Sequence, residues 1–191
     1  MRYPEGRRAE TRGRIVECAA RRFRQDGYAA ASVGEIMRDA GLTVGGFYAH
    51  FESKEQLFAE ALDVAGSQAL AARDPGPVAP EQWVPGFVAR YLSLAHVQDR
   101  AEGCPLTALG AEVARAGEGP RSAYRDATEY FVSTLADHLG GADPVRTARS
   151  IAAMCVGALT LARGGMTDAE AAALFADCAQ SVEELLGVTS R

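Results

Sequence analysis

The stretch SVGEIMRDAGLTVGGFYAHF, residues 32–51, decides how the rest of the chain is interpreted. Ser32 and Glu35 have the S-x-x-E spacing of a capping box, which opens a short helix that Gly41 is predicted to end. Thr43 has the side chain of an N-cap and is predicted to begin a second short helix. Two short helices joined by a turn of about three residues predict a helix-turn-helix motif.

Gly45 and Gly46 stand near the start of this second helix, where glycine is costly. In a helix interior each glycine lowers the stability of the helix by about 1 kcal/mol relative to alanine. A helix that meets DNA with its N-terminus benefits from positions without side chains, because its backbone N–H groups can then approach phosphates or base edges closely. The glycine pair therefore favours a helix that enters the major groove of DNA by its N-terminal end.

Apolar residues recur at helical spacing along the whole chain, and no run alternates as a strand would, so the sequence predicts an all-α fold. Ile15, Ala19 and Phe23 line one face of a first helix, which Gly27 is expected to end. A proline- and glycine-rich loop is expected over 73–80. Beyond the helix-turn-helix, a capping box starts one long helix at Ser53, and later helices are expected at 82–97, 105–115, 120–139, 144–162 and 168–186.

Charge is distributed unevenly between the two parts of the chain. The first 54 residues carry ten basic and seven acidic residues, whereas the remaining residues carry ten basic and eighteen acidic ones. A basic end on an acidic body favours a localised nucleic-acid contact. A sequence-nonspecific architectural binder would need a more basic body.

We expect no secretory signal, because no apolar run of the required length follows the N-terminal arginines. We therefore expect a cytoplasmic protein. The longest uncharged apolar run, Ser150 to Ala162, is about 13 residues long and suits a buried helix better than a membrane span. The four cysteines contain no C-x-x-C pair, so neither a zinc site nor a disulfide framework is expected, and no cofactor is predicted.

Residues Thr11 to Leu62 resemble the DNA-binding domain of TetR-type (tetracycline-repressor-like) transcriptional regulators. The residues that carry the resemblance agree in identity and spacing: Thr11, Ile15, Ala19, Ala20, Phe23, Gly27, Tyr28, Tyr48, His50, Phe51, Ser53, Lys54 and Leu57. The resemblance implies a helix-turn-helix DNA-binding domain over residues 1–53. It implies a helical effector-binding and dimerisation domain over residues 54–191.

The resemblance also implies roles for residues of the motif. Four residues are expected to face the major groove: Thr43, Val44, Gly45 and Gly46. Three are expected on the phosphate backbone, namely Tyr48, His50 and Lys54, and the arm residues Arg7, Arg8 and Arg12 are further candidates. The spacing of Phe47, Phe51 and Phe58 is typical of core residues. The expected partner is a pseudo-palindromic double-stranded DNA operator.

The C-terminal part is expected, from the same resemblance, to bind a small-molecule effector and to form a homodimer, with no membrane contact. Two apolar helices at the C-terminus support dimerisation through an isologous four-helix interface, although they could be central helices of a monomer. The candidate effector-binding residues are Trp83, Phe87, Tyr91, His96, Cys104, Tyr124 and Phe131. Ordinary core packing is the alternative for each of them.

We therefore predict a ligand-responsive dimeric repressor that a small molecule releases from its operator. The alternative is a helical thiol-active enzyme, or a sensor of oxidants or electrophiles, that acts through Cys104. Pro105 fits a first helical position, which places Cys104 at an N-cap, where backbone N–H groups favour a thiolate. No catalytic motif and no clustered carboxylate pair is present, so we expect no enzyme and assign no catalytic residue.

Overall fold

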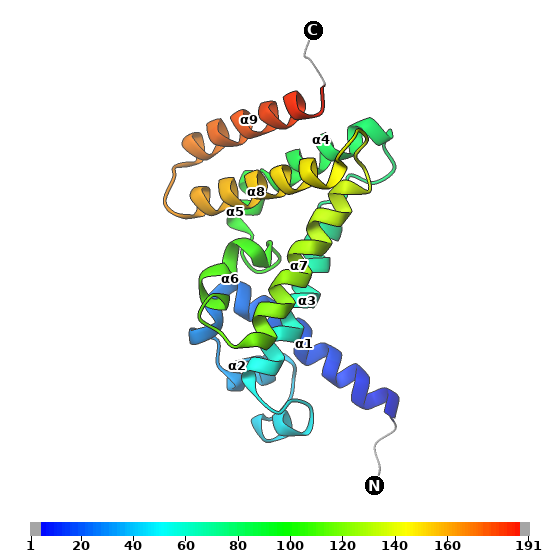
Figure 1. Cartoon of the computed structure of the whole chain (residues 1–191). Helices are drawn as coiled ribbons and strands as arrows, with labels where there is room; N and C mark the ends of the chain where they lie inside the picture. The colour runs from blue at the N-terminus through cyan, green and yellow to red at the C-terminus, as the bar shows by residue number, and fades with distance from the viewer. Residues whose placement is uncertain (1–4, 188–191) are drawn as a thin grey trace.

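The computed structural model describes residues 5–187, and every regular element in that part of the chain is helical, which confirms the all-α class (Figure 1). The N-terminal elements are α1 (Glu5–Ala30), α2 (Val33–Asp39), the 3₁₀ helix η1 (Val44–Ala49) and α3 (Lys54–Ala71). The C-terminal elements are α4 (Pro80–Tyr91), α5 (Leu94–Gln98), α6 (Pro105–Val113), α7 (Glu118–Ala136), α8 (Pro144–Arg163) and α9 (Asp168–Leu185).

Two hydrophobic cores lie at opposite ends of the molecule, and α3 joins them. Leu57 and Phe58 near the start of α3 pack into the first core with α1, α2 and η1, whereas Ala69 and Leu70 near its end belong to the second. Helix α7 packs along α3, and α8 and α9 lie at the end remote from α2 (Figure 1). The domain boundary expected between residues 53 and 54 thus falls at the start of a helix that serves both cores, and it stays a prediction.

The helical backbone of the first helix ends at Gly27 as expected, and a separate short helical turn then runs to Ala30 within α1. Gly27 itself leaves the helical conformation, with φ 83° and ψ 165°, a region that side chains disfavour. The carboxylate of Glu112 on α6 accepts the backbone N–H of Tyr28 at 2.9 Å and that of Ala29 at 3.4 Å. The glycine therefore marks a break in α1 that a side chain from the C-terminal part stabilises.

The helix expected over 82–97 is two helices, α4 and α5, separated at Leu92 and Ser93. Leu92 has a non-helical ψ of 72°. Ser93 caps α5, because its hydroxyl accepts the N–H of His96 at 3.2 Å, and it also donates to the carbonyl of Arg90. A local serine cap thus competes with helix continuation, which the apolar spacing alone does not reveal.

Helix α8 is long and apolar enough, by length and composition, to cross a membrane. Its inner face instead packs against α7 and α9, with Ile151, Cys155 and Leu159 fully buried. Core helices of soluble proteins satisfy the same criterion, so the finding is weak support for a membrane span.

Candidate nucleic-acid interface

Hydrogen bonds fix both ends of α2 and thereby the point where the turn to η1 begins. The capping box at the start of α2 is present, since the Ser32 hydroxyl accepts the N–H of Glu35 and the Glu35 carboxylate accepts that of Ser32. At the other end Gly41 adopts φ 70°, and the N–H of Leu42 donates to the carbonyl of Met37 at 2.8 Å. The expected helix-turn-helix arrangement is therefore formed.

The second helix of the motif, η1, is a 3₁₀ helix of six residues, and its expected cap is absent. The Thr43 side chain makes no capping hydrogen bond, although the N–H of Gly46 donates to the Thr43 carbonyl at 3.0 Å. Thr43 thus occupies the N-cap position of η1 as predicted, but its side chain does not supply the capping hydrogen bond. Buried Phe47 instead holds the helix on the core, so packing rather than capping positions η1.

Gly45 and Gly46 are not required by the fold. A Cβ atom added at Gly45 would meet no other part of the protein within 4 Å, and one at Gly46 would meet only the end of Met37 at 3.7 Å, an ordinary contact. Neither residue has a positive φ. Because the protein itself tolerates side chains here, the missing side chains leave room for something outside the chain.

The residues around the glycine pair face solvent. Thr43 is exposed, Val44 is 53% exposed, and Tyr48 is 78% exposed although it is aromatic. The ring of Tyr48 stacks edge-on against buried Phe47 at 5.2 Å between ring centroids, which orients it on the outer surface. An exposed apolar and aromatic surface next to side-chain-free backbone is typical of an interaction site.

His50 borders a hollow of about 300 Å³ between η1 and the start of α1. Arg7 and Arg8 also line this hollow, and Arg8 donates to the carbonyl of Ala49 at 2.7 Å. Burial lowers the pKa of His50, and nearby Arg8 and Arg12 lower it further, so the imidazole is neutral at neutral pH. His50 can therefore act on a phosphate as a hydrogen-bonding group but adds no charge.

Lys54 lies at the first turn of α3, half-buried, and its ammonium group contacts α1. Its Nζ donates to the carbonyl of Tyr28 at 2.5 Å and lies 4.4 Å from the centroid of the Tyr28 ring. Burial lowers the pKa of Lys54. The structure thus gives Lys54 a structural contact that sequence reasoning missed, in addition to the phosphate contact that stays a prediction.

Arg12, the third arm candidate, is held within the protein. It forms an ion pair with Glu60 of α3 and lies over the ring of Phe51, 4.6 Å from its centroid. A guanidinium engaged on both sides is less available to DNA than an unpaired one. Among the arm residues, Arg7 and Arg8 are therefore the better candidates.

The candidate effector residues form a packed aromatic cluster in the second core. Phe87 lies 5.3 Å from Trp83 and 5.7 Å from Phe131 between ring centroids, and Tyr91 lies 5.4 Å from Phe131. All four side chains are buried. The structure thus brings these residues together, but as mutually filled core rather than as the walls of one cavity.

His96 and Cys104 lie beside this cluster and are linked by a hydrogen bond. The Cys104 N–H donates to His96 Nε2 at 3.1 Å, while Arg73 Nε lies 3.2 Å from His96 Nδ1. Burial, together with the neighbouring charge of Arg73, lowers the pKa of His96 to about 3. Arg73 is itself buried, and no pattern in the sequence singles it out.

The structure argues against the alternative in which Cys104 acts as a reactive thiolate. Cys104 is at the N-cap of α6, as expected, and backbone groups of Leu106 and Thr107 favour its thiolate. The residue is only 2% exposed, however, and burial outweighs these contacts and raises the pKa of its thiol. Both properties oppose reaction with an oxidant or an electrophile.

Tyr124 and Phe131 border a separate pocket of about 250 Å³ between α6, α7 and α8. Its walls are mainly apolar, with Thr128 and Arg149 as polar groups, and Tyr124 donates its hydroxyl to the carbonyl of Leu106 at 2.9 Å. An apolar pocket with a few polar groups suits a small organic ligand. Of the seven candidates, these two therefore line the pocket that fits such a ligand best.

Comparison with known proteins agrees with this geometry. Residues 15–61 match the family model for bacterial regulatory proteins of the tetR family. The HTH-type transcriptional regulator AcrR of Shigella flexneri is 43% identical over 58 residues, which cover 30% of this chain and 27% of AcrR. LmrA of Bacillus subtilis is 26% identical over 134 residues, covering 68% of this chain and 71% of LmrA. The match spans only about a quarter of the length of AcrR and of Bacillus subtilis YdgC.

Solved structures share the fold over nearly the whole chain. A TetR transcriptional regulator from Chloroflexus aurantiacus J-10-FL superposes with a TM-score of 0.75 and 28% identity, covering 93% of this chain and 96% of that one. Reduced Escherichia coli NemR, at 19% identity and a TM-score of 0.72, covers 88% of this chain and 95% of its own and shares the fold. Fold and motif together define an all-helical protein with an N-terminal helix-turn-helix domain. Over residues 15–61 this domain is similar to the TetR family of bacterial regulatory proteins.

Proposed function

We propose that this chain is a dimeric, ligand-responsive transcriptional regulator that represses by occupying an operator and is released by a small molecule. The observation that carries the proposal is the side-chain-free surface at Gly45 and Gly46, which the fold does not require, beside highly exposed Tyr48. A cytoplasmic location follows from this role. We assign no catalytic function to the chain.

In this proposal η1 enters the major groove with its N-terminal end. Thr43, Val44, Gly45 and Gly46 face the base edges, since all four lie at the exposed start of η1 or directly before it. Tyr48, His50 and Lys54 then approach the phosphate backbone on either side. Contacts to phosphate position the protein, and contacts to base edges select the sequence.

Dimerisation is supported by the outward faces of α8 and α9. On α8 the exposed residues include Ala153, Gly157 and Leu161, and on α9 they include Ala172 and Ala176. Small residues allow helices to approach closely, and the exposed apolar side chain of Leu161 favours burial in an interface. Two copies of this helix pair form an isologous four-helix contact remote from η1.

The effector pocket is proposed at Tyr124 and Phe131. Its volume of about 250 Å³ lies at or below the low end of typical ligand pockets, which are about 300–1,000 Å³, so the effector is small or displaces a side chain on binding. The pocket lies between α6, which contacts α1, and α8 of the proposed interface. A ligand there can therefore change the spacing of the two DNA-binding domains.

A direct test is a gel-shift assay with genomic fragments at about 50 and 200 mM salt, with the wild type and Tyr48→Ala. Specific complexes of the wild type should survive salt that removes phosphate-only binding. Tyr48→Ala should weaken them while the circular dichroism spectrum is unchanged, because this side chain is 78% exposed. Binding to every fragment alike, or equal binding by the variant, would contradict the proposal.

A further inference from the structure

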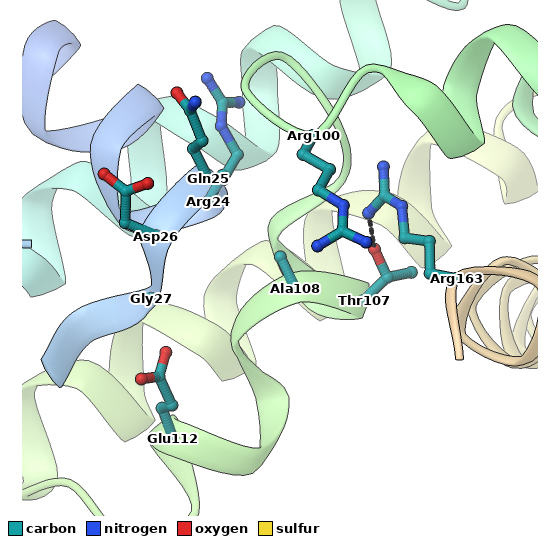
Figure 2. Close-up of a pocket in the computed structure, with 9 residues that line it drawn as sticks. All are labelled: Arg24, Gln25, Asp26, Gly27, Arg100, Thr107, Ala108, Glu112 and Arg163. Atoms are coloured by element: carbon teal, nitrogen blue, oxygen red, sulfur yellow. Dashed lines mark hydrogen bonds between the residues drawn. The ribbon is translucent and has the colours of Figure 1, made fainter. Parts of the chain in front are cut away.

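A second pocket, of about 300 Å³, lies where α1, α6, the loop before α6 and the end of α8 meet (Figure 2). Its walls include three arginines, Arg24, Arg100 and Arg163, together with Asp26 and Glu112. The pocket is distinct from the DNA-binding surface and from the proposed effector pocket. Its volume is about ten times the roughly 30 Å³ that one water molecule occupies.

The two acidic residues of this pocket already have partners within the protein. Asp26 pairs with Arg22 at 3.1 Å. Glu112 accepts the backbone N–H groups of Tyr28 and Ala29 at the break in α1. Asp26 is therefore paired with an arginine outside the pocket, whereas Glu112 keeps its charge but directs its carboxylate toward the break in α1 and away from Arg100 and Arg163 (Figure 2).

Arg163 has only neutral hydrogen-bond acceptors in the part of the chain that the structure describes. It donates to the hydroxyl of Thr107 at 2.8 Å (Figure 2) and to the carbonyls of His96 at 2.7 Å, Asp99 at 3.1 Å and Val97 at 3.4 Å. Burial lowers the pKa of Arg163, and nearby Arg100 lowers it further. A half-buried guanidinium with a like charge beside it lacks the counter-ion that burial calls for.

Arg100 is exposed, and its side chain makes no hydrogen bond or ion pair to residues 5–187. Figure 2 shows its guanidinium group directed toward Thr107 and Arg163 rather than away from the pocket. Arg24, on the α1 wall, is 3% exposed; it pairs with Glu102 at 3.2 Å, and its buried Nε has no partner among the described residues. The pocket thus combines uncompensated positive charge with unused donors.

We propose that this pocket binds a small molecule that carries carboxylate or phosphate groups, held by Arg100 and Arg163. A guanidinium presents a planar fork of N–H donors that matches the oxygens of either group, often in bidentate fashion. The Thr107 hydroxyl lies beside this fork. An anion here contacts α1 of the DNA-binding domain on one side and α6 and α8 on the other, and so fixes the junction between them.

The test compares Tm in inorganic phosphate, in succinate and in chloride at matched ionic strength. The wild type should gain about 3–6 °C at ten times the Kd of the bound anion. Arg100→Ala should lose most of this gain. Arg115→Ala, which removes an equally exposed charge outside the pocket, should keep it and so controls for general stabilisation by phosphate.

Hydrogen exchange then locates the bound anion. Protection by phosphate or succinate should appear in segments 24–31 and 99–112. Protection confined to 42–50, the DNA-binding surface, would overturn the proposal, as would equal responses of Arg100→Ala and Arg115→Ala or no gain over chloride. The Tm and hydrogen-exchange measurements contain no DNA. They can therefore fail while the gel-shift assay still shows operator binding, and they can succeed when that assay fails.

Discussion

At position 45 a methyl group would meet no other atom of the protein within 4 Å, whereas at position 41 a φ of 70° strains any residue that has a side chain. Gly45→Ala should therefore keep or raise the free energy of unfolding, by up to about 1 kcal/mol. Gly41→Ala should lower it by about 1–2 kcal/mol. Urea denaturation measures both changes.

The Gly45→Ala and Gly41→Ala variants also distinguish an effect on stability from an effect on DNA binding. Fluorescence anisotropy on a bound DNA fragment should show weaker binding by Gly45→Ala, because the added methyl group stands where the backbone approaches DNA. If Gly45→Ala binds as tightly as the wild type, the glycine does not serve close approach, and the assignment of the reading surface must move to other residues.

The buried thiols give a second prediction at this scale. Burial raises the pKa of both Cys104 and Cys155, and each is at most 2% exposed. Maleimide should label these two cysteines only when the protein opens, with rates that rise together as urea is added. Rapid labelling of Cys104 in native buffer, detected by mass spectrometry, would restore the sensor hypothesis.

Individual residues differ in how well the sequence predicts them. The burial of Phe47, Phe51 and Phe58 follows from helical spacing, and the structure confirms it. The burial of Cys104 could not be predicted, because an N-cap position does not determine which residues pack over its side chain. The contact of Lys54 with the Tyr28 carbonyl was missed for a similar reason, since it joins residues that are 26 positions apart.

At the scale of single elements, α5 offers a pH-dependent test through His96. Its pKa is about 3 in the folded protein and 6.5 ordinarily, so the unfolded chain binds more protons below pH 6.5. The contribution of neutral His96 to the free energy of unfolding is therefore complete above pH 6.5, and it is lost as the pH falls toward 3. One such histidine should lower the free energy of unfolding by about 1.4 kcal/mol between pH 7.5 and pH 5.5.

Urea titrations at fixed protein concentration measure this difference. His50, whose pKa is also lowered by burial, contributes with the same sign. His96→Leu should be less stable at pH 7.5, and its stability should depend less on pH than that of the wild type. Stability that is constant or rising from pH 7.5 to pH 5.5 would contradict a neutral buried His96.

Element boundaries were predictable where side chains cap a helix, and less so elsewhere. The capping box at Ser32 starts α2 as expected, and a capping box at Thr167 starts α9 at the expected residue 168. Ser93 has no glutamate three residues later to complete a capping box, so the sequence predicts one helix where the structure has α4 and α5. The 3₁₀ geometry of η1 was also missed, because a segment of six residues carries too little periodicity to separate the two helix types.

At the scale of the whole molecule, the outward face of α8 tests dimerisation. Gly157 is exposed, and a Cβ atom there would meet nothing within 4 Å in the monomer. Gly157→Glu should therefore leave the fold intact but place a charge inside the proposed interface, which gives a monomer by light scattering at micromolar concentration. Gly13→Glu, at an exposed helix position that is equally open, should remain dimeric. A dimeric Gly157→Glu protein would place the interface elsewhere.

The central claim is that two copies of η1 read one symmetric operator. The most direct test selects bound molecules from a pool of random DNA duplexes with the wild-type protein and sequences them. The account predicts a pseudo-palindromic consensus whose half-sites are centred about 34–36 Å apart, or a multiple of that distance, because each half-site occupies a major groove on the same side of the duplex. A pool without enrichment, or an enriched site without two-fold symmetry, would contradict it.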